Sequence, residues 1–365
     1  MAKTEKDLQV NMSVVETVRK YSYEYDETSN GNGQYVAYGP NNDFPTLMKN
    51  CYRQSATLKS IIDGSVNYIL GDEVVVNDSA AQFQEKVNRT GMTMRGLIAN
   101  LALSLQTYGG FAIQVIYSKL NTICELYPLD FSKCRTNEKG TKIYYNKKGW
   151  GKYTTKCEEF DRFNRDTFNP EKPTQIFYCK GDYTNNVYPI PAWYGALNDV
   201  LTEIECSRYS LNSVASGFSA KYILNFPYDE NLTKEQKDVI EASLKEKFCG
   251  PDTSSNFMLY FGNENGDNIT IEKMQTDDTP EMYISIKDNA RSNIFTALRT
   301  TPALMGLPSA TTGFNSQEYS SAYKLYQKTV ISPLQDLILE TINKILGTVN
   351  AVTITPFKIN FDNAD

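Results

Sequence analysis

The chain has 365 residues, of which 41% are hydrophobic, and a mean hydropathy of −0.45, so it can bury a core and is not a disordered chain. Lys and Arg number 37 against 43 Asp and Glu, and the net charge of −6 gives no overall positive field for nucleic acid. The chain has no histidine, which excludes Ser-His-Asp and Cys-His catalytic arrangements and zinc sites with histidine ligands.

The seven cysteines are scattered and form no C-x-x-C pair, a pattern typical of free thiols in a reducing compartment. The N-terminal sequence MAKTEKDLQVNMS has no apolar segment of the kind that a secretory signal requires. No run approaches the ~20 apolar residues of a membrane span. We therefore expect a soluble protein that is assembled inside the cell.

Residues 1–43 are polar and rich in turn-forming residues, so a loop-like segment is expected. Within it, Gly31-Asn32-Gly33 has a spacing that suits phosphate binding, but no Lys-Ser/Thr pair completes a P-loop. We interpret these glycines as loop residues.

Residues 44–190 are predicted to form an α+β domain in which helices precede antiparallel strands. Apolar residues at helical spacing predict three helices, one from Pro45 and two over 55–70 and 93–107. The β-rich runs 111–117 and 122–127 flank a short turn and predict a hairpin. Further short strands are expected at 142–145, 151–156 and 175–179.

Long helices are expected after residue 190. Within 191–218, apolar residues recur every three or four positions from Trp193 to Phe218, which predicts one helix of about 39 Å. Thr279 as N-cap and Pro280 in the first turn predict a second long helix over 279–305. Each helix has a single apolar stripe, so each is expected to pack along one side only.

Residues 219–275, between these helices, are predicted to form a small α+β unit. Its helix is introduced by the capping box Thr233…Gln236. The runs 257–262 and 268–274 are predicted to pair as a hairpin. So short a unit can barely sustain its own core, so support from neighbouring copies is expected.

The C-terminal part begins with a small, polar segment, 306–315, which is predicted to be a loop. A third long helix is expected over 316–346, with a kink at Pro333 because proline removes a backbone donor. The alternating run within 350–362 predicts a strand that joins the N-terminal sheet.

Two groups of carboxylates invite a chemical interpretation: Glu158, Glu159 and Asp161, and Asp277 with Asp278. They could form a divalent-metal or acid–base site, as in a metal-dependent nucleotide-processing enzyme. The first group is equally explained as a solvated surface, and the second as acidic residues that favour a helix N-terminus; neither explanation requires a catalytic or metal site.

The order of several segments resembles the portal proteins of tailed bacteriophages, in their compact form. These segments are, in chain order, YVAYGPNNDFP (35–45) followed by Ser55, LxxYGGFAIQVIY…LYPLD (105–130), Pro191-Ala192-Trp193, LTKEQ (232–236), Ala297-Leu298…Thr301-Pro302…Leu304–Leu307, Phe314-Asn315…Glu318, and Pro333 with its following helix. No single motif is specific, but the ordered set covers about 35–360. The C-terminus is too short for the large crown of some portals.

The resemblance implies an α+β, portal-like fold. Its parts are a polar N-terminal segment (1–43), an α/β wing (44–190), a first stem helix (191–218), a small α+β clip insertion (219–275), a second stem helix (279–305), a tunnel loop (306–315), a kinked tunnel helix (316–346) and a C-terminal strand that returns to the wing (350–362). The stem helices would run antiparallel, with the clip between their ends.

The resemblance also implies a function. The chain would be one subunit of a closed ring, typically a dodecamer, at one capsid vertex, through which double-stranded DNA is packaged and ejected without sequence specificity. The implied partners are further copies of the chain, the major capsid protein, the terminase large subunit and the head–tail adaptor. The protein would be a structural virion component and not an enzyme, assembled in the bacterial cytoplasm, without a cofactor, a metal or a membrane.

The net charge of the chain limits how strongly the implied channel can bind DNA. Twelve copies at −6 carry −72, so the ring repels DNA, and a conduit should bind phosphate weakly because each contact adds salt-dependent affinity. Lys287, Arg291 and Arg299 lie four and eight positions apart along the second stem helix and are candidate channel-facing cations. Salt bridges between subunits are an equally open alternative.

The tunnel loop is expected to be mobile and to touch DNA through small, uncharged atoms, and its residues are Ser309, Ala310, Thr311, Thr312, Gly313, Phe314 and Asn315. Phe314 is expected to pack on a neighbouring subunit. Lys245 and Lys247, on the clip helix, are candidates for docking the motor or the adaptor. The alternatives left open are a ring-forming head–tail adaptor and the metal-dependent enzyme.

Overall fold

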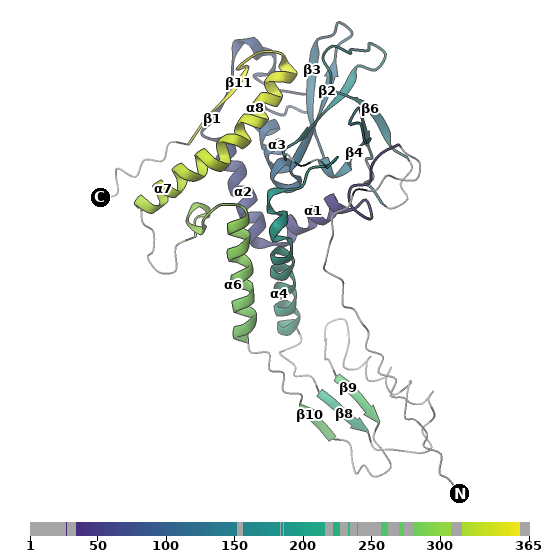
Figure 1. Cartoon of the computed structure of the whole chain (residues 1–365), viewed down its shortest axis with the longest axis vertical. Helices are drawn as coiled ribbons and strands as arrows, with labels where there is room; N and C mark the ends of the chain where they lie inside the picture. The colour runs from purple at the N-terminus through teal and green to yellow at the C-terminus, as the bar shows by residue number, and fades with distance from the viewer. Residues whose placement is uncertain are drawn as a thin grey trace.

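The computed structural model describes residues 27, 34–151, 156–182, 184, 186–215, 222–226, 233, 239, 257–261, 270–273, 280–307 and 316–357. It shows a mixed α+β body from which two long helices extend side by side, with a small sheet beyond their far ends (Figure 1). Among the described residues, no helix has both the length and the apolar composition that a bilayer span requires.

The body begins with three helices, α1 (Phe44–Gln54), α2 (Ala56–Leu70) and α3 (Met94–Tyr108). The Ser55 hydroxyl caps α2 by accepting a hydrogen bond from the Leu58 backbone N–H (3.0 Å), and Thr93 caps α3 in the same way. Helix α3 ends at Gly109 (φ 79°), where a Cβ would lie 2.7 Å from the Ile190 carbonyl oxygen. The three helices predicted from the apolar spacing are confirmed.

The strands of the body form a six-stranded sheet in the order β3-β2-β7-β6-β5-β4. They are β2 (Gly110–Tyr117), β3 (Ile123–Leu129), β4 (Cys134–Thr136), β5 (Lys142–Tyr145), β6 (Glu158–Arg162) and β7 (Thr174–Lys180). The predicted hairpin of 111–117 with 122–127 is confirmed, since β2 and β3 pair antiparallel. Strand β6 pairs in parallel with β7, so the expectation of a wholly antiparallel set is wrong.

Two strand predictions in this region need correction. Most of the predicted strand 151–156 lies outside the described residues, and its described ends are not strand. The neighbouring strand β6 was missed because its sequence, EEFDR, resembles a charged loop more than a β-strand. Two short 3₁₀ helices, η1 (Asp78–Phe83) and η2 (Phe131–Lys133), complete the body.

The C-terminal strand β11 (Val352–Thr355) pairs antiparallel with β1 (Glu73–Val76), and Val74 lies opposite Ile354. The two form a sheet of their own, so the expected addition to the main sheet is wrong. The pairing still joins the C-terminal part to the first half of the chain, next to α2.

The first long helix starts as a 3₁₀ turn, η3 (Ala192–Ala196), and continues as α4 (Leu197–Ala215). The second is α6 (Pro280–Ala297), which begins at the predicted proline. The predicted extension of this helix to residue 305 is wrong, because Arg299 adopts φ 52°. A separate 3₁₀ turn, η4 (Pro302–Met305), follows.

The end of α6 has the geometry of a Schellman motif. The N–H of Thr300 donates to the Phe295 carbonyl (3.1 Å) and the N–H of Arg299 to the Thr296 carbonyl (3.0 Å). Arg299 occupies the left-handed position that glycine normally takes, so this helix end has no recognisable sequence signal.

The third long helix consists of α7 (Ser316–Tyr326), a π-helical segment η5 (Gln327–Ile331) and α8 (Ser332–Leu346). The π-helical segment ends two residues before Pro333, which has no N–H to continue the regular helical hydrogen-bond pattern. The irregularity expected at Pro333 therefore takes the form of a π segment one turn earlier.

The small sheet beyond α4 and α6 contains β8 (Tyr222–Phe226), β9 (Phe257–Phe261) and β10 (Thr270–Lys273). The strand order is β10-β8-β9, and β8 pairs in parallel with β9. The predicted hairpin between β9 and β10 is wrong, because β8 lies between them; the alternation within each run does not specify its partner. Of the predicted capping box only Thr233 is described.

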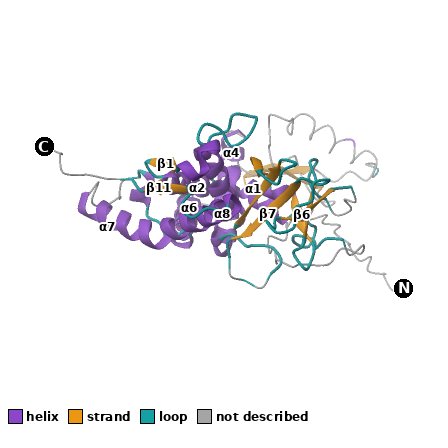
Figure 2. Ribbon diagram, turned by 90° about the horizontal axis from the view of Figure 1, so that it is seen from above, coloured by secondary structure: helices purple, strands orange, loops and turns teal. Residues whose placement is uncertain are grey.

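Two buried clusters hold the body together. One joins α3, β2, α8 and β11; the other joins α1, α2 and the main sheet to the nearer ends of α4 and α6. Seen from above, the helices lie together at one side of the strands of the main sheet (Figure 2). Trp193 belongs to the second cluster, is fully buried, and donates from Nε1 to the Gln106 carbonyl (3.1 Å). The body therefore fixes the roots of both long helices.

Candidate functional site

The paired helices α4 and α6 are the first element of the candidate site. They run antiparallel (Figure 1) and are joined by Asn293 Nδ2, which donates to Asp199 Oδ1 (2.8 Å). Further from the body, the rings of Tyr209 and Tyr283 stack at 4.4 Å. Contacts between the two helices therefore continue along their length.

Burial falls steeply along this pair. Near the body, Val200 and Ile294 are fully buried. The outer halves expose large apolar side chains, namely Tyr209 (46%), Leu211 (67%), Met282 (44%), Ile284 (60%) and Ile286 (38%). Apolar residues gathered on one part of a surface mark an interaction site more often than single exposed ones do.

The three candidate cations lie in different settings. Lys287 and Arg291 are one turn apart on α6, and the Arg291 guanidinium lies 5.9 Å from the centre of the Phe295 ring. Arg299 follows the helix in a left-handed conformation, so the expected row of three along one helix is wrong for this residue. None of the three forms an ion pair with another described residue.

Lys287 also lies near the neighbouring helix. Burial raises the pKa of the Cys206 thiol on α4, and the charge of Lys287 partly offsets that increase. Lys287 itself is exposed on α6.

The carboxylates of β6 form ion pairs on the surface of the sheet. Lys142 Nζ lies 2.6 Å from Asp161 Oδ1 and 3.0 Å from Glu159 Oε1, and Lys147 pairs with Glu158 (3.1 Å). The hydrogen bonds to Asp161 and Glu159 raise the pKa of Lys142. No group of three or more Cys, Asp or Glu side chains that could hold a metal occurs among the described residues. Asp277 and Asp278 lie outside them.

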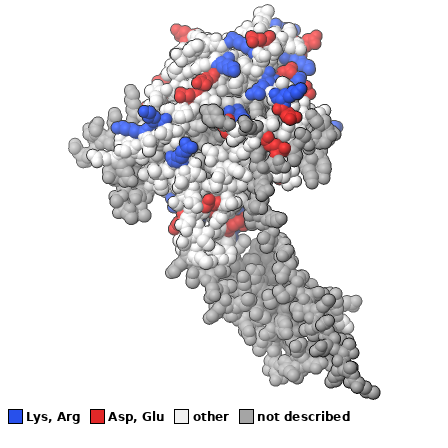
Figure 3. Space-filling view, in the orientation of Figure 1, with Lys and Arg blue, Asp and Glu red and all other residues white. Residues whose placement is uncertain are grey.

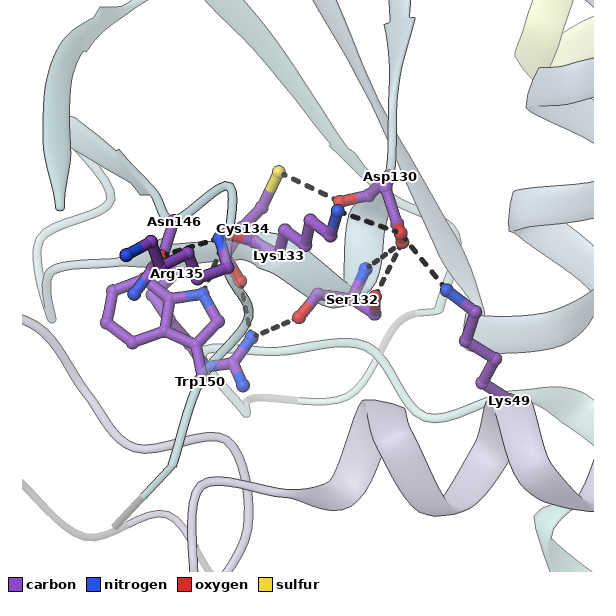
Figure 4. Close-up of polar contacts among 9 residues, drawn as sticks. Lys49, Asp130, Ser132, Lys133, Cys134, Arg135, Asn146 and Trp150 are labelled. Atoms are coloured by element: carbon purple, nitrogen blue, oxygen red, sulfur yellow. Dashed lines mark hydrogen bonds and ion pairs between the residues drawn. The ribbon is translucent and has the colours of Figure 1, made fainter. Parts of the chain in front are cut away.

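A polar network fixes α1 to the sheet (Figure 4). Asp130 pairs with Lys49 Nζ (3.1 Å) and accepts from the backbone N–H and hydroxyl of Ser132. Burial alone would raise the pKa of Asp130, but the hydrogen bonds from Ser132 and Lys49 outweigh burial and hold that pKa below its usual value.

The neighbouring Arg135 fixes the segment that precedes α1. It is 1% exposed and donates to the carbonyl oxygens of Asn42 (2.8 Å) and Cys134 (2.7 Å) and to the Asn42 side chain. Its guanidinium also lies 5.5 Å from the Tyr38 ring and 5.1 Å from the Trp150 ring. This buried cation was not predictable from the sequence, because its partner Asn42 lies 93 residues away.

The candidate loop residues Ser309–Asn315 and the candidate docking residues Lys245 and Lys247 lie outside the described part of the chain. The structure does describe both flanks of the loop, η4 before it and α7 after it. Side chains of α2 form hydrogen bonds with both flanks, although the flanks are remote from α2 in sequence.

A model of the phage portal protein family matches residues 62–364. The chain belongs to the phage portal protein family. Proteins of this family are structural components of the virion and not enzymes. The match is to portals and not to the head–tail adaptors that the sequence left open. No curated protein matches the chain.

Solved structures show the same fold. A chain in the virion of a native gene transfer agent (GTA) particle has a TM-score of 0.54 at 14% identity, with 88% of this chain and 85% of that chain covered. The neck of the native GTA particle, computed with twelvefold symmetry, gives the same values. An HK97 family phage portal protein from Corynebacterium diphtheriae has a TM-score of 0.51 at 12% identity, with 81% of this chain and 88% of that chain covered.

Proposed function

We propose that the chain is the subunit of a dodecameric ring at one capsid vertex, through which double-stranded DNA is packaged and ejected. The observation that carries the proposal is the α4–α6 pair, whose root is buried in the body and whose outer half exposes apolar side chains. In a ring, neighbouring subunits would cover these side chains. The related GTA neck was computed with twelvefold symmetry, which supports the same number of copies here.

The parts of the chain are assigned accordingly. Residues 44–190 form the wing, and the pairing of β11 with β1 supports adding the C-terminal strand to it. Helices α4 and α6 form the stem, and the sheet β8–β10 belongs to the clip at its far end. The segment 306–315 is the tunnel loop, and α7 to α8 form the tunnel helix.

The channel contacts DNA weakly and without reading its sequence. Twelve copies at −6 carry −72, so the ring as a whole does not hold phosphate. On the face shown in Figure 3, the described Lys and Arg side chains are interspersed with Asp and Glu and do not form a continuous basic patch. Lys287 and Arg291 provide local positive charge on the stem, and their side chains have no acidic partner among the described residues.

The clip is assigned to the docking of the terminase large subunit during packaging and of the head–tail adaptor afterwards, with Lys245 and Lys247 as contact residues. The wing is assigned to contact with the major capsid protein. The protein thus belongs to the portal vertex of the virion and is assembled in the bacterial cytoplasm. Deleting residues 219–275 tests the clip assignment, because rings that still bind both motor and adaptor would contradict it.

Electron microscopy of the purified full-length protein tests the ring itself. Rings with a central hole, and no intrinsic ATPase activity, are the expected result. A compact monomer at micromolar concentration, or nucleotide hydrolysis by the purified chain, would overturn the proposal.

A further inference from the structure

One face of α2 lies between the two flanks of the tunnel loop. Gly64 and Ser65 lie four and three positions before Tyr68, and residues at these spacings are neighbours on one side of a helix. On one side lies η4, which precedes the loop, and on the other lies α7, which follows it. We call these three residues the α2 clamp.

The Tyr68 hydroxyl contacts both flanks at once. It donates to the Leu304 carbonyl of η4 (2.8 Å) and lies 3.1 Å from the Tyr319 hydroxyl of α7. A tyrosine hydroxyl has one hydrogen, and a carbonyl oxygen can only accept. Tyr319 is therefore the donor in the second bond, so one oxygen atom joins η4 and α7. Burial, and then the hydrogen bond with Tyr319, raises the pKa of Tyr68, so the hydroxyl keeps its proton.

Aromatic packing restrains the ring that carries this hydroxyl. The Tyr68 ring centre lies 5.7 Å from the ring centres of both Tyr323 and Tyr326 on α7, and 6.1 Å from that of Phe357. Aromatic pairs at these separations add packing energy beyond their buried area. The direction of the hydroxyl is therefore set by α7 and by the chain after β11.

The other two clamp residues hold one flank each. The hydroxyls of Ser65 and Tyr326 lie 2.6 Å apart, and both residues are buried. This hydrogen bond is a second connection between α2 and α7, in addition to that of Tyr68 with Tyr319. At Gly64, an added Cβ would lie 2.6 Å from Met305 Sδ. Glycine therefore leaves the space in which the Met305 side chain of η4 rests on α2.

We propose that the α2 clamp positions both ends of the tunnel loop, and that Tyr68 is its central positioning residue. The inference rests on the proposed function, in which residues 306–315 face DNA in the channel. Because one hydroxyl joins both flanks, the separation of the loop ends is set by the wing helix α2 of the same subunit. Force on either flank passes to α2.

Helix α2 is itself fixed to the stem at its other end. The Glu203 carboxylate of α4 accepts hydrogen bonds from the Ser55 hydroxyl and from the Thr57 N–H (3.3 Å) and hydroxyl (2.7 Å), at the N-terminus of α2. The loop flanks and the stem thus share one rigid support. A displacement of the loop ends would be transmitted to α4 through α2.

Hydrogen–deuterium exchange on the assembled full-length ring tests the clamp. The substitution Tyr68→Phe removes the shared oxygen and keeps the ring. One lost hydrogen bond is expected to raise exchange about two- to tenfold. The rise should appear at the amides of Leu304, Gly306 and Leu307, which bond within the η4 turn, and in α7.

Two matched variants separate the clamp from a general loss of packing. Tyr323→Phe removes a hydroxyl that donates to the Phe357 carbonyl (3.0 Å) and should leave exchange in η4 unchanged. Ser65→Ala removes only the bond to Tyr326 and should raise exchange in α7 but not in η4. Equal exchange in Tyr68→Phe and wild type, or the same η4 increase in Tyr323→Phe, would overturn the clamp.

Measuring how well Tyr68→Phe particles retain packaged DNA tests the α2 clamp and the proposed function of the tunnel loop independently. Faster exchange in both flanks with reduced retention supports both proposals. Faster exchange with full retention leaves the clamp in place and contradicts the DNA-facing role of the loop. Reduced retention with unchanged exchange contradicts the clamp.

Discussion

The two halves of the stem are stabilised in different ways. At the root, Trp193, Val200 and Ile294 are fully buried, and Glu203 has three hydrogen bonds to the start of α2. In the outer half, Leu211 and Ile284 are more than half exposed. The root buries its polar and apolar groups within one chain, whereas the outer half exposes apolar surface, which neighbouring chains cover in the proposed ring.

This difference separates folding from assembly. A substitution at the root should destabilise each subunit whether or not a ring forms. A substitution in the outer half should leave the isolated subunit unchanged and weaken the ring. The variants below test that division, from the largest expected effect to the smallest.

The largest effect is expected for Trp193→Ala. The substitution removes a fully buried ring and leaves the Gln106 carbonyl without its donor, so unfolding should become easier by about 3–5 kcal/mol. Urea denaturation followed by fluorescence or circular dichroism measures the change. The control is Tyr209→Ala in the outer half, which should change subunit stability by less than about 0.5–1 kcal/mol. Equal losses in the two variants would break the comparison.

A smaller loss is expected for Glu203→Ala. Removing a carboxylate that is 4% exposed leaves the Ser55 and Thr57 hydroxyls and the Thr57 N–H without their acceptor, for a loss of about 2–3 kcal/mol. The matched variant Glu205→Ala removes a half-exposed carboxylate paired with Arg208 and should lose less than about 1 kcal/mol. The same denaturation experiment compares them. If Glu203→Ala is neutral, α2 is not fixed to the stem in this way.

The sequence predicted the elements that carry their own boundary signals. The apolar spacing over 55–70 and 93–107 placed α2 and α3 within a residue of their ends, and the structure shows that Ser55, Thr93 and Gly109 cap them. The end of α6 was missed because Arg299 takes the position that glycine usually occupies. A local pattern identifies a helix end only when the usual residue stands there.

Contacts between distant segments were not predictable. Strand β8 pairs with both β9 and β10, and nothing in the alternation of these runs specifies which strand lies in the middle. Tyr68 bonds Leu304 and Tyr319, which lie 236 and 251 residues away. The sequence predicted α4, α6 and α7–α8 as helices, whereas the residues that fix them to α2 became visible only in three dimensions.

In the outer half of the stem, Leu211→Asp is expected to weaken the ring. Burying one leucine side chain contributes about 1.5–3 kcal/mol, and each subunit contact would lose that amount. Mass photometry or sedimentation of the full-length protein should show monomers and partial rings at concentrations where the wild type is fully assembled. The stability of the isolated subunit should not change.

The matched control is Leu120→Asp, which changes a leucine that is 88% exposed at the turn between β2 and β3. This variant should assemble like the wild type, because the turn belongs to the body and not to the stem. Intact rings of Leu211→Asp, or equal disassembly of both variants, would show that the outer half does not depend on its neighbours.

The smallest effect is expected for the charged residues of the stem. In the double variant Lys287→Gln with Arg291→Gln, rings should form normally, because neither side chain pairs with a described carboxylate. If these cations face the channel, each phosphate contact that is lost makes the slope of log affinity for DNA against log salt shallower by about one unit. Titrating double-stranded DNA into rings at several salt concentrations measures the slope.

The control for the charged residues is Arg299→Gln, because Arg299 lies beyond the end of α6 in a left-handed conformation and not in line with the other two. Its salt slope should equal that of the wild type. If Lys287 and Arg291 instead form salt bridges between subunits, the double variant should keep the wild-type salt slope for DNA binding. Its rings should then dissociate at a lower salt concentration than wild-type rings, because each lost exposed pair contributes less than about 1 kcal/mol to ring stability. That pattern would move Lys287 and Arg291 from the channel to the subunit contact. It would also place charged residues beside Leu211 and Ile284 in the surface that neighbouring chains cover.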